Sequence, residues 1–135
     1  MGRREVVAPG LSRPVGHFAQ AITVDADDRL VFVSGMTARG VDGSVVGAGD
    51  VEEQTRQACR NMQAILEAAG SGLGDVVRVD VYVRNIEHFD AVHRVRREFF
   101  PPPAPASTLV EVAKLVDPDM LVELTAIAVA PGEQR

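Results

Sequence analysis

The sequence predicts an α+β fold in which two amphipathic helices cover one face of a mixed β-sheet. Three observations lead to this prediction. Residues 50–70 carry the cap, the apolar stripe and the stop signal of a helix. Residues 76–83 alternate in a way that is typical of a strand. The elements follow in the order hairpin, helix, strand, helix and two strands, which indicates a ferredoxin-like arrangement.

Length and composition favour one domain covering residues 1–135. No apolar run approaches the roughly 20 residues that cross a bilayer, so we expect no membrane span. The arginines near the start precede no apolar segment of the secretory type. A lone Cys59 excludes an internal disulfide and permits a reducing compartment, which makes the cytoplasm the expected location.

Charge argues against nucleic acid as a partner. The formal net charge is −5, which repels a phosphate backbone on average. The basic residues Arg94, Arg96 and Arg97 would spread over more than one face of a helix, so we expect a solvated helix surface there. Aromatic residues are 4% of the chain, which leaves few platforms for stacked bases.

The N-terminal third predicts short strands and turns. Residues 4–8 could form a first strand. Residues 17–24 and 30–33 flank the polar turn 25–28, which predicts a β-hairpin. The glycine-rich stretch that follows is expected to be a loop with one short strand at 44–46.

The first helix has the clearest signals at both ends. Asp50 is placed to accept from the amide of Glu53, and Glu53 to reach back to the amide of Asp50. Gly70 stops the helix because it adopts the left-handed conformation without a Cβ clash. Its apolar stripe consists of Val51, Ala58, Met62, Ile65, Leu66 and Ala69.

The C-terminal half continues the alternation of strand and helix. After the strand 76–83, Asn85 is expected to cap a second helix, which the prolines 101–103 end. Its apolar side consists of Phe89, Val92, Val95 and Phe99. Two strands follow, near 107–113 and 120–129. In both, the two alternating sets are largely apolar, whereas a two-layer fold covers only one face. We therefore expect a homo-oligomer packed sheet to sheet.

Glu123 is the carboxylate with the strongest case for chemistry. Like Glu111, it interrupts an apolar strand. One interpretation is a paired structural carboxylate or a rim residue. The other is a carboxylate that positions or deprotonates a water. His17, His88 and His93 lack ligand-like spacing, so we assign no metal.

The order of motifs along the chain resembles the Rid/YjgF family. The matching stretches are 16–22, 31–35, 53–57, 64–70, 75–77, 110–113 and 122–128. The resemblance implies a chorismate-mutase-like fold, a homotrimer, and intersubunit clefts that bind a small molecule. Members of the RidA type are imine or enamine deaminases, which add water to a reactive imine and release ammonia without metal or organic cofactor.

The resemblance also assigns residues. Glu123 matches the glutamate that orients the water, which makes it the expected catalytic residue. The expected substrate-binding residues are Phe18, Ser34, Gly35, Phe89, His93, Ser107 and Leu109. Two of these depart from the family pattern: Ser107 stands where the family has the arginine that grips the substrate carboxylate, and Phe18 stands where it has a tyrosine. One hydroxyl cannot replace a bidentate guanidinium.

These departures shape the functional hypotheses. The first is a hydrolase that deaminates an imine or enamine, or cleaves a related C–N bond, in a substrate other than a simple 2-imino acid. The second is a non-catalytic small-ligand-binding or chaperone-like trimer. The third is an endoribonuclease, which the charge and the aromatic content argue against. Arg39 or Arg84 could supply the missing cation in the cleft.

Overall fold

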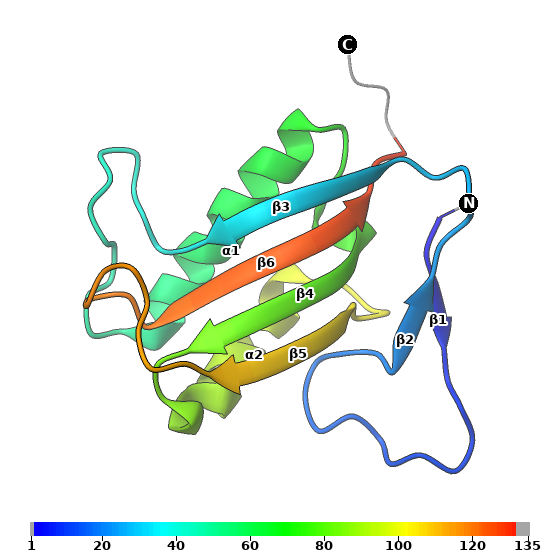
Figure 1. The fold of residues 1–135 in the computed structure, drawn as a ribbon, viewed down its shortest axis with the longest axis horizontal. Coiled ribbons are helices and arrows are strands. Elements are labelled where there is room, and N and C mark those ends of the chain that lie inside the picture. The colour runs from blue at the N-terminus through cyan, green and yellow to red at the C-terminus, as the bar shows by residue number, and fades with distance from the viewer. Residues whose placement is uncertain (1, 132–135) are drawn as a thin grey trace.

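The computed structural model describes residues 2–131, and its centre is a four-stranded sheet in the order β3-β6-β4-β5. β5 runs parallel to β4, and the other neighbours are antiparallel. Two helices lie behind one face of this sheet (Figure 1). The bounds are β3 Leu30–Met36, α1 Val51–Ala68, β4 Val76–Val83, α2 Phe89–Phe99, β5 Ala106–Glu111 and β6 Val122–Val129. The predicted α+β class with both helices on one face is confirmed.

The ends of α1 follow the sequence signals with one exception. Asp50 accepts a hydrogen bond from the amide of Glu53 at 3.1 Å. The reciprocal bond from Asp50 to the Glu53 side chain is absent, because the amide of Asp50 donates instead to the carbonyl of Gly47 at 2.9 Å. Gly70 has φ +78° and follows the last turn, as its role as a stop requires.

The core lies between the helices and the inward face of the sheet. It contains buried valines of β4 and the residues Val122 and Leu124 of β6. Along α1 the buried line is centred on Thr55, Cys59 and Met62. Ile65 was predicted to be in the stripe, but it is 46% exposed because it lies on the flank of that line.

The second helix begins later than predicted. Asn85 accepts from the amide of Glu87 at 2.9 Å, and this bond caps the short 3₁₀ helix η2, Ile86–His88. The helix α2 starts directly after it, at Phe89. Buried Val92 and Val95 confirm its apolar side.

The predicted hairpin of 17–24 with 30–33 is wrong. β2, Ala21–Thr23, pairs with β1, Arg4–Val6, in a separate two-stranded sheet, and β3 pairs with β6. The amide of Ala19 bonds to the carbonyl of Pro105 at 2.9 Å, which holds the chain before β2 beside the start of β5. Figure 1 shows the β1–β2 pair off the end of the main sheet at which β4 and β5 begin. The predicted strand 44–46 is reduced to a single bridge between Arg39 and Val45.

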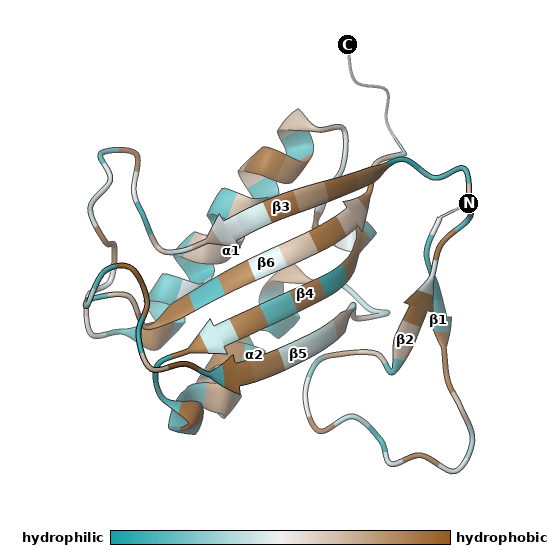
Figure 2. Cartoon of the chain, viewed as in Figure 1, coloured by the Kyte–Doolittle hydropathy of each residue, from teal (hydrophilic) through white to brown (hydrophobic). Residues whose placement is uncertain are grey.

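The face of the sheet away from the helices is partly apolar. Phe32 of β3 is 72% exposed there, and its pairing partner on β6 is Ile127. Figure 2 shows apolar stretches along β3 and β6. The same face also carries a polar network, in which Asp80 accepts from Arg78 at 2.9 Å and from the amide of Thr108 at 3.1 Å. Within residues 2–131, no helix is long and apolar enough to span a membrane.

Candidate functional site

Glu123 lies at the start of β6, against the end of β3. A Cβ atom built on Gly35 would overlap the carboxylate of Glu123, so a side chain at position 35 would displace that carboxylate. Ser34 is the exposed residue before it. In the described part of the chain, the Glu123 carboxylate has neither a hydrogen-bond donor nor an ion-pair partner. It therefore does not form the paired structural contact that was one interpretation of the sequence.

A cavity of about 330 Å³ opens beside this carboxylate. We call it the Glu123 cavity, and its lining includes Gly35, Arg39, Asn61, Val116 and Glu123. The Asn61 amide donates to the carbonyl of Thr37 at 2.9 Å and to that of Arg39 at 2.8 Å. These two bonds fix the chain that follows β3 against α1. The Glu123 cavity thus combines a carboxylate, a cation and a rigid wall.

Phe18, Phe89 and His93 form a second group on and above α2. The ring of His93 lies 4.3 Å from that of Phe89 and 6.4 Å from that of Phe18, between centroids. Gly16 passes so close that a Cβ there would lie 2.5 Å from Cε1 of His93. The 16–19 segment therefore packs directly on the imidazole.

His93 is a neutral hydrogen-bond donor in this group. Burial lowers its pKa to about 4, and the charges of Arg96, Arg97 and His17 act in the same direction. Its Nδ1 accepts from the amide of His17 at 3.0 Å, so the hydrogen-bond network assigns the proton to Nε2. This buried Nε2 has no partner among the described residues.

Arg96 is buried completely, which corrects the predicted solvated surface. It lies one helical turn after His93, on the side of α2 that the 16–19 segment covers, and its Nη2 donates to the carbonyl of His17 at 3.1 Å. Burial lowers its pKa to about 10, which leaves it charged at pH 7. Arg94, in contrast, is exposed and pairs with Glu52 at 2.6 Å.

Ser107 and Leu109 lie on the helix side of β5. Ser107 pairs with Val79, a buried residue of β4, so both side chains point toward the helices. The Ser107 hydroxyl is buried without a described partner. Leu109 packs against the hydrophobic core.

The sheet separates the two groups of expected site residues within one chain. Glu123 pairs with Tyr82 of β4, whereas Ser107 pairs with Val79. Tyr82 and Val79 are three residues apart on one strand, so they point to opposite faces. Glu123, Ser34 and Gly35 are brought together, but the group around His93 lies on the other side. Sequence reasoning missed Arg96 as a buried group, and it named Arg39 without placing it beside Glu123.

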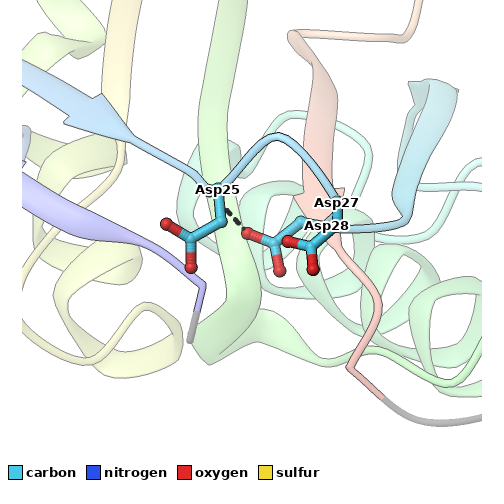
Figure 3. A group of neighbouring side chains, drawn as sticks. All are labelled: Asp25, Asp27 and Asp28. Atoms are coloured by element: carbon cyan, nitrogen blue, oxygen red, sulfur yellow. Dashed lines mark hydrogen bonds between the residues drawn. The ribbon is translucent and has the colours of Figure 1, made fainter.

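A single cysteine and one group of carboxylates carry no site. Cys59 is fully buried, and burial raises the pKa of its thiol to about 12, which keeps it inert. Asp25, Asp27 and Asp28 offer oxygens within 4.8 Å of one another in the turn before β3 (Figure 3). There the Asp25 amide donates to Asp28 at 2.8 Å, and Arg4 lies 3.3 Å from Asp25. Carboxylates gathered in a turn do not by themselves assign a metal.

Comparisons with known proteins agree on one family. Residues 10–130 match the family model described as Endoribonuclease L-PSP. A RutC family protein of Pyrococcus abyssi is 35% identical over 95% of this chain and 98% of its own length. The 2-iminobutanoate/2-iminopropanoate deaminase of Dermatophagoides farinae is 34% identical over 94% of this chain and 96% of its own. The crystal structure of the Rid family protein YyfB from Yersinia pestis has a TM-score of 0.87 at 28% identity, covering 96% of this chain and 99% of that one.

Proposed function

Because this chain belongs to the Rid/YjgF family, whose model is described as Endoribonuclease L-PSP, we propose that it is a hydrolase that deaminates a reactive imine or enamine. The observation that carries the proposal is the unpaired carboxylate of Glu123, which lies over Gly35 beside a cavity of about 330 Å³. The relative from Dermatophagoides farinae, named as an imine deaminase, supports the reaction class.

In the proposed reaction Glu123 acts as general base and then as general acid. Its carboxylate accepts a hydrogen bond from a water and takes a proton as the oxygen attacks the imine carbon. The π electrons move to nitrogen, which takes the proton back from Glu123, and the product is a carbinolamine. Glu123 then removes the hydroxyl proton and passes it to nitrogen, the oxygen electrons form the carbonyl as the C–N bond breaks, and ammonia leaves. An enamine first gains a proton on carbon and becomes the imine.

We place this reaction in clefts between the subunits of a homotrimer. In one chain Glu123 and His93 lie on opposite faces of the sheet, so a second copy would have to bring a His93 group to a Glu123 cavity. The exposed Phe32 on the open face supports such packing. The buried free thiol of Cys59 fits a reducing location, which we take to be the cytoplasm.

Ser107 limits the substrate. Without an arginine on β5, a carboxylate directly on the imine carbon loses its charged partner in the cleft. We therefore propose a substrate other than a simple 2-imino acid. The same residue favours the rival hypothesis, a trimer that binds a small ligand without turnover.

Replacement of Glu123 by glutamine separates these two hypotheses. Glu123→Gln keeps the shape of the side chain but cannot take a proton, so hydrolysis should slow by about two orders of magnitude or more. Ammonia release is measured over a panel of imines generated in situ by an amine or amino acid oxidase. A circular dichroism spectrum and light scattering confirm that the variant keeps its fold and assembly. Turnover unchanged by the substitution would return Glu123 to a structural role.

A further inference from the structure

We propose that Arg39 holds the anionic group of the substrate, and that the substrate class is an imine or enamine carrying a carboxylate. This inference rests on the proposed use of the Glu123 cavity. Arg39, in the chain after β3, would supply the positive charge that Ser107 on β5 lacks.

The backbone of Arg39 is held firmly at the wall of this cavity. Asn61 donates to its carbonyl at 2.8 Å, and the Asn61 oxygen in turn accepts from the Gln57 side chain at 2.9 Å. A bridge to Val45 ties down the other side of the same residue. The start of the side chain is therefore fixed, and only the exposed guanidinium is left to adapt to a ligand.

The positive charge and most N–H donors of the Arg39 guanidinium are not used within residues 2–131. One nitrogen, Nη1, donates to the carbonyl of Gly43 at 2.6 Å. No carboxylate of residues 2–131 pairs with it, whereas Arg78 pairs with Asp80 at 2.9 Å and Arg94 with Glu52 at 2.6 Å. The remaining N–H groups of its planar fork match the two oxygens of a carboxylate.

The other cations near this end of the sheet do not line the Glu123 cavity. Arg84 lines a different cavity, of about 340 Å³, together with Lys114. Val116 contributes to both cavities and lies between them. Arg96 is fully buried on the helix side. Among residues 2–131, Arg39 is thus the cation that lines the Glu123 cavity.

This placement also affects which anion fits. An arginine at position 107 would approach from the other face of the sheet, and so from a second copy in a trimer. Arg39 approaches from the same chain as Glu123. The two arginine positions would hold a carboxylate at different places relative to the imine carbon that the water attacks. Arg39 therefore selects substrates in which the carboxylate is not attached to the imine carbon.

A binding measurement tests whether Arg39 is the anchor, the residue that holds the ligand carboxylate, without requiring turnover. The probe is 4-oxopentanoate, a stable keto acid whose carboxylate is remote from the carbonyl, and its uncharged partner is 4-oxopentanamide. Calorimetric titrations compare the wild-type protein with Arg39→Met, with Arg39→Lys and with the matched control Arg84→Met. Both arginines are replaced by a side chain of similar length that has no charge.

Arg39→Met should weaken binding of 4-oxopentanoate by about tenfold or more, to the level of the amide, and Arg39→Lys should recover part of the loss. Arg84→Met should stay within about twofold of wild type. Salt should weaken binding to wild type and leave Arg39→Met nearly unaffected. Equal binding by Arg39→Met, loss in Arg84→Met, or no wild-type binding at millimolar ligand would overturn the inference.

Failure of the anchor and failure of the proposed function give different results. Glu123→Gln should keep Arg39-dependent binding, since it removes no cation. If that binding holds while no imine is hydrolysed, the anchor stands and the protein is a ligand-binding trimer. If imines with a remote carboxylate are hydrolysed with the same efficiency by Arg39→Met, the hydrolase stands and the role of Arg39 is wrong.

Discussion

At the scale of single residues, the least predictable feature is which polar side chains are buried. Arg96 and Gln54 are both fully buried, although neither belongs to an apolar stripe. Three hydrogen bonds compensate for the burial of the Gln54 side chain. Its amide nitrogen donates to the carbonyls of Gly47 and Asp119, and its oxygen accepts from the amide of Leu121. Helical periodicity identifies the apolar side of a helix, but such partners come from distant loops that a local pattern cannot locate.

The neutral state of His93 makes stability depend on pH. Its pKa is about 4 in the folded protein and 6.5 when unperturbed, so between these values the unfolded chain binds more protons. The stabilisation is fully present above pH 6.5 and is lost as pH falls through 4. Across this range the free energy of unfolding should fall by up to about 3 kcal/mol. Urea unfolding at a series of pH values measures this change in the free energy of unfolding.

The matched variant is His93→Asn, which can still accept from the amide of His17 but does not titrate. Its free energy of unfolding should fall less between pH 7 and pH 4 than that of wild type. A part of the slope remains, because burial also lowers the pKa of His17. Identical slopes in the two proteins would show that His93 does not carry the effect.

At the scale of elements, the helix and strand with complete local signals were predicted well. The helix α1 has its cap at Asp50 and its stop at Gly70, and β4 has strict alternation. Strand pairing was predicted less well. The turn 25–28 indicated a hairpin, but β3 found its partner in β6, about a hundred residues further on in the sequence. Local turn chemistry does not decide between a near and a distant partner.

The cap of α1 gives a prediction for this scale. Asp50→Ala removes the acceptor of the Glu53 amide and should lower the free energy of unfolding by about 1 kcal/mol. The control is Asp90→Ala, because Asp90 lies in the first turn of α2 but makes no cap bond. Thermal unfolding compares the two. An equal effect of both substitutions would mean that charge near a helix start matters here, and the cap bond does not.

At the scale of the whole molecule, the expected trimer remains a prediction. Phe32 lies on the open face of the sheet, and covering it would remove a large apolar side chain from water. Phe32→Asp should therefore dissociate the assembly, since an unpaired carboxylate is costly to bury. Light scattering at micromolar concentration gives the mass. Val41→Asp, at an exposed loop position, should leave the mass unchanged. A monomeric wild-type protein would refute the predicted assembly.

The candidate site could be predicted from the sequence only in part. Glu123, Ser34 and Gly35 were named and lie together, because they occupy neighbouring strands of one sheet. The separation of Ser107 from Glu123 by the sheet could not be predicted without the register of β4. The same is true of Arg39, which reaches the Glu123 cavity through a loop held by Asn61.

The proposed function is imine hydrolysis of the Rid type in a cleft that holds Glu123 but lacks an arginine on β5. Ser107→Arg tests this proposal because it restores a guanidinium at that position. The assay measures release of 2-oxobutanoate from 2-iminobutanoate generated in situ by an amino acid oxidase. Wild type should be poor, Ser107→Arg should raise kcat/KM by about a hundredfold, and Glu123→Gln should abolish the gain. Efficient wild-type turnover that Ser107→Arg leaves unchanged would contradict the account.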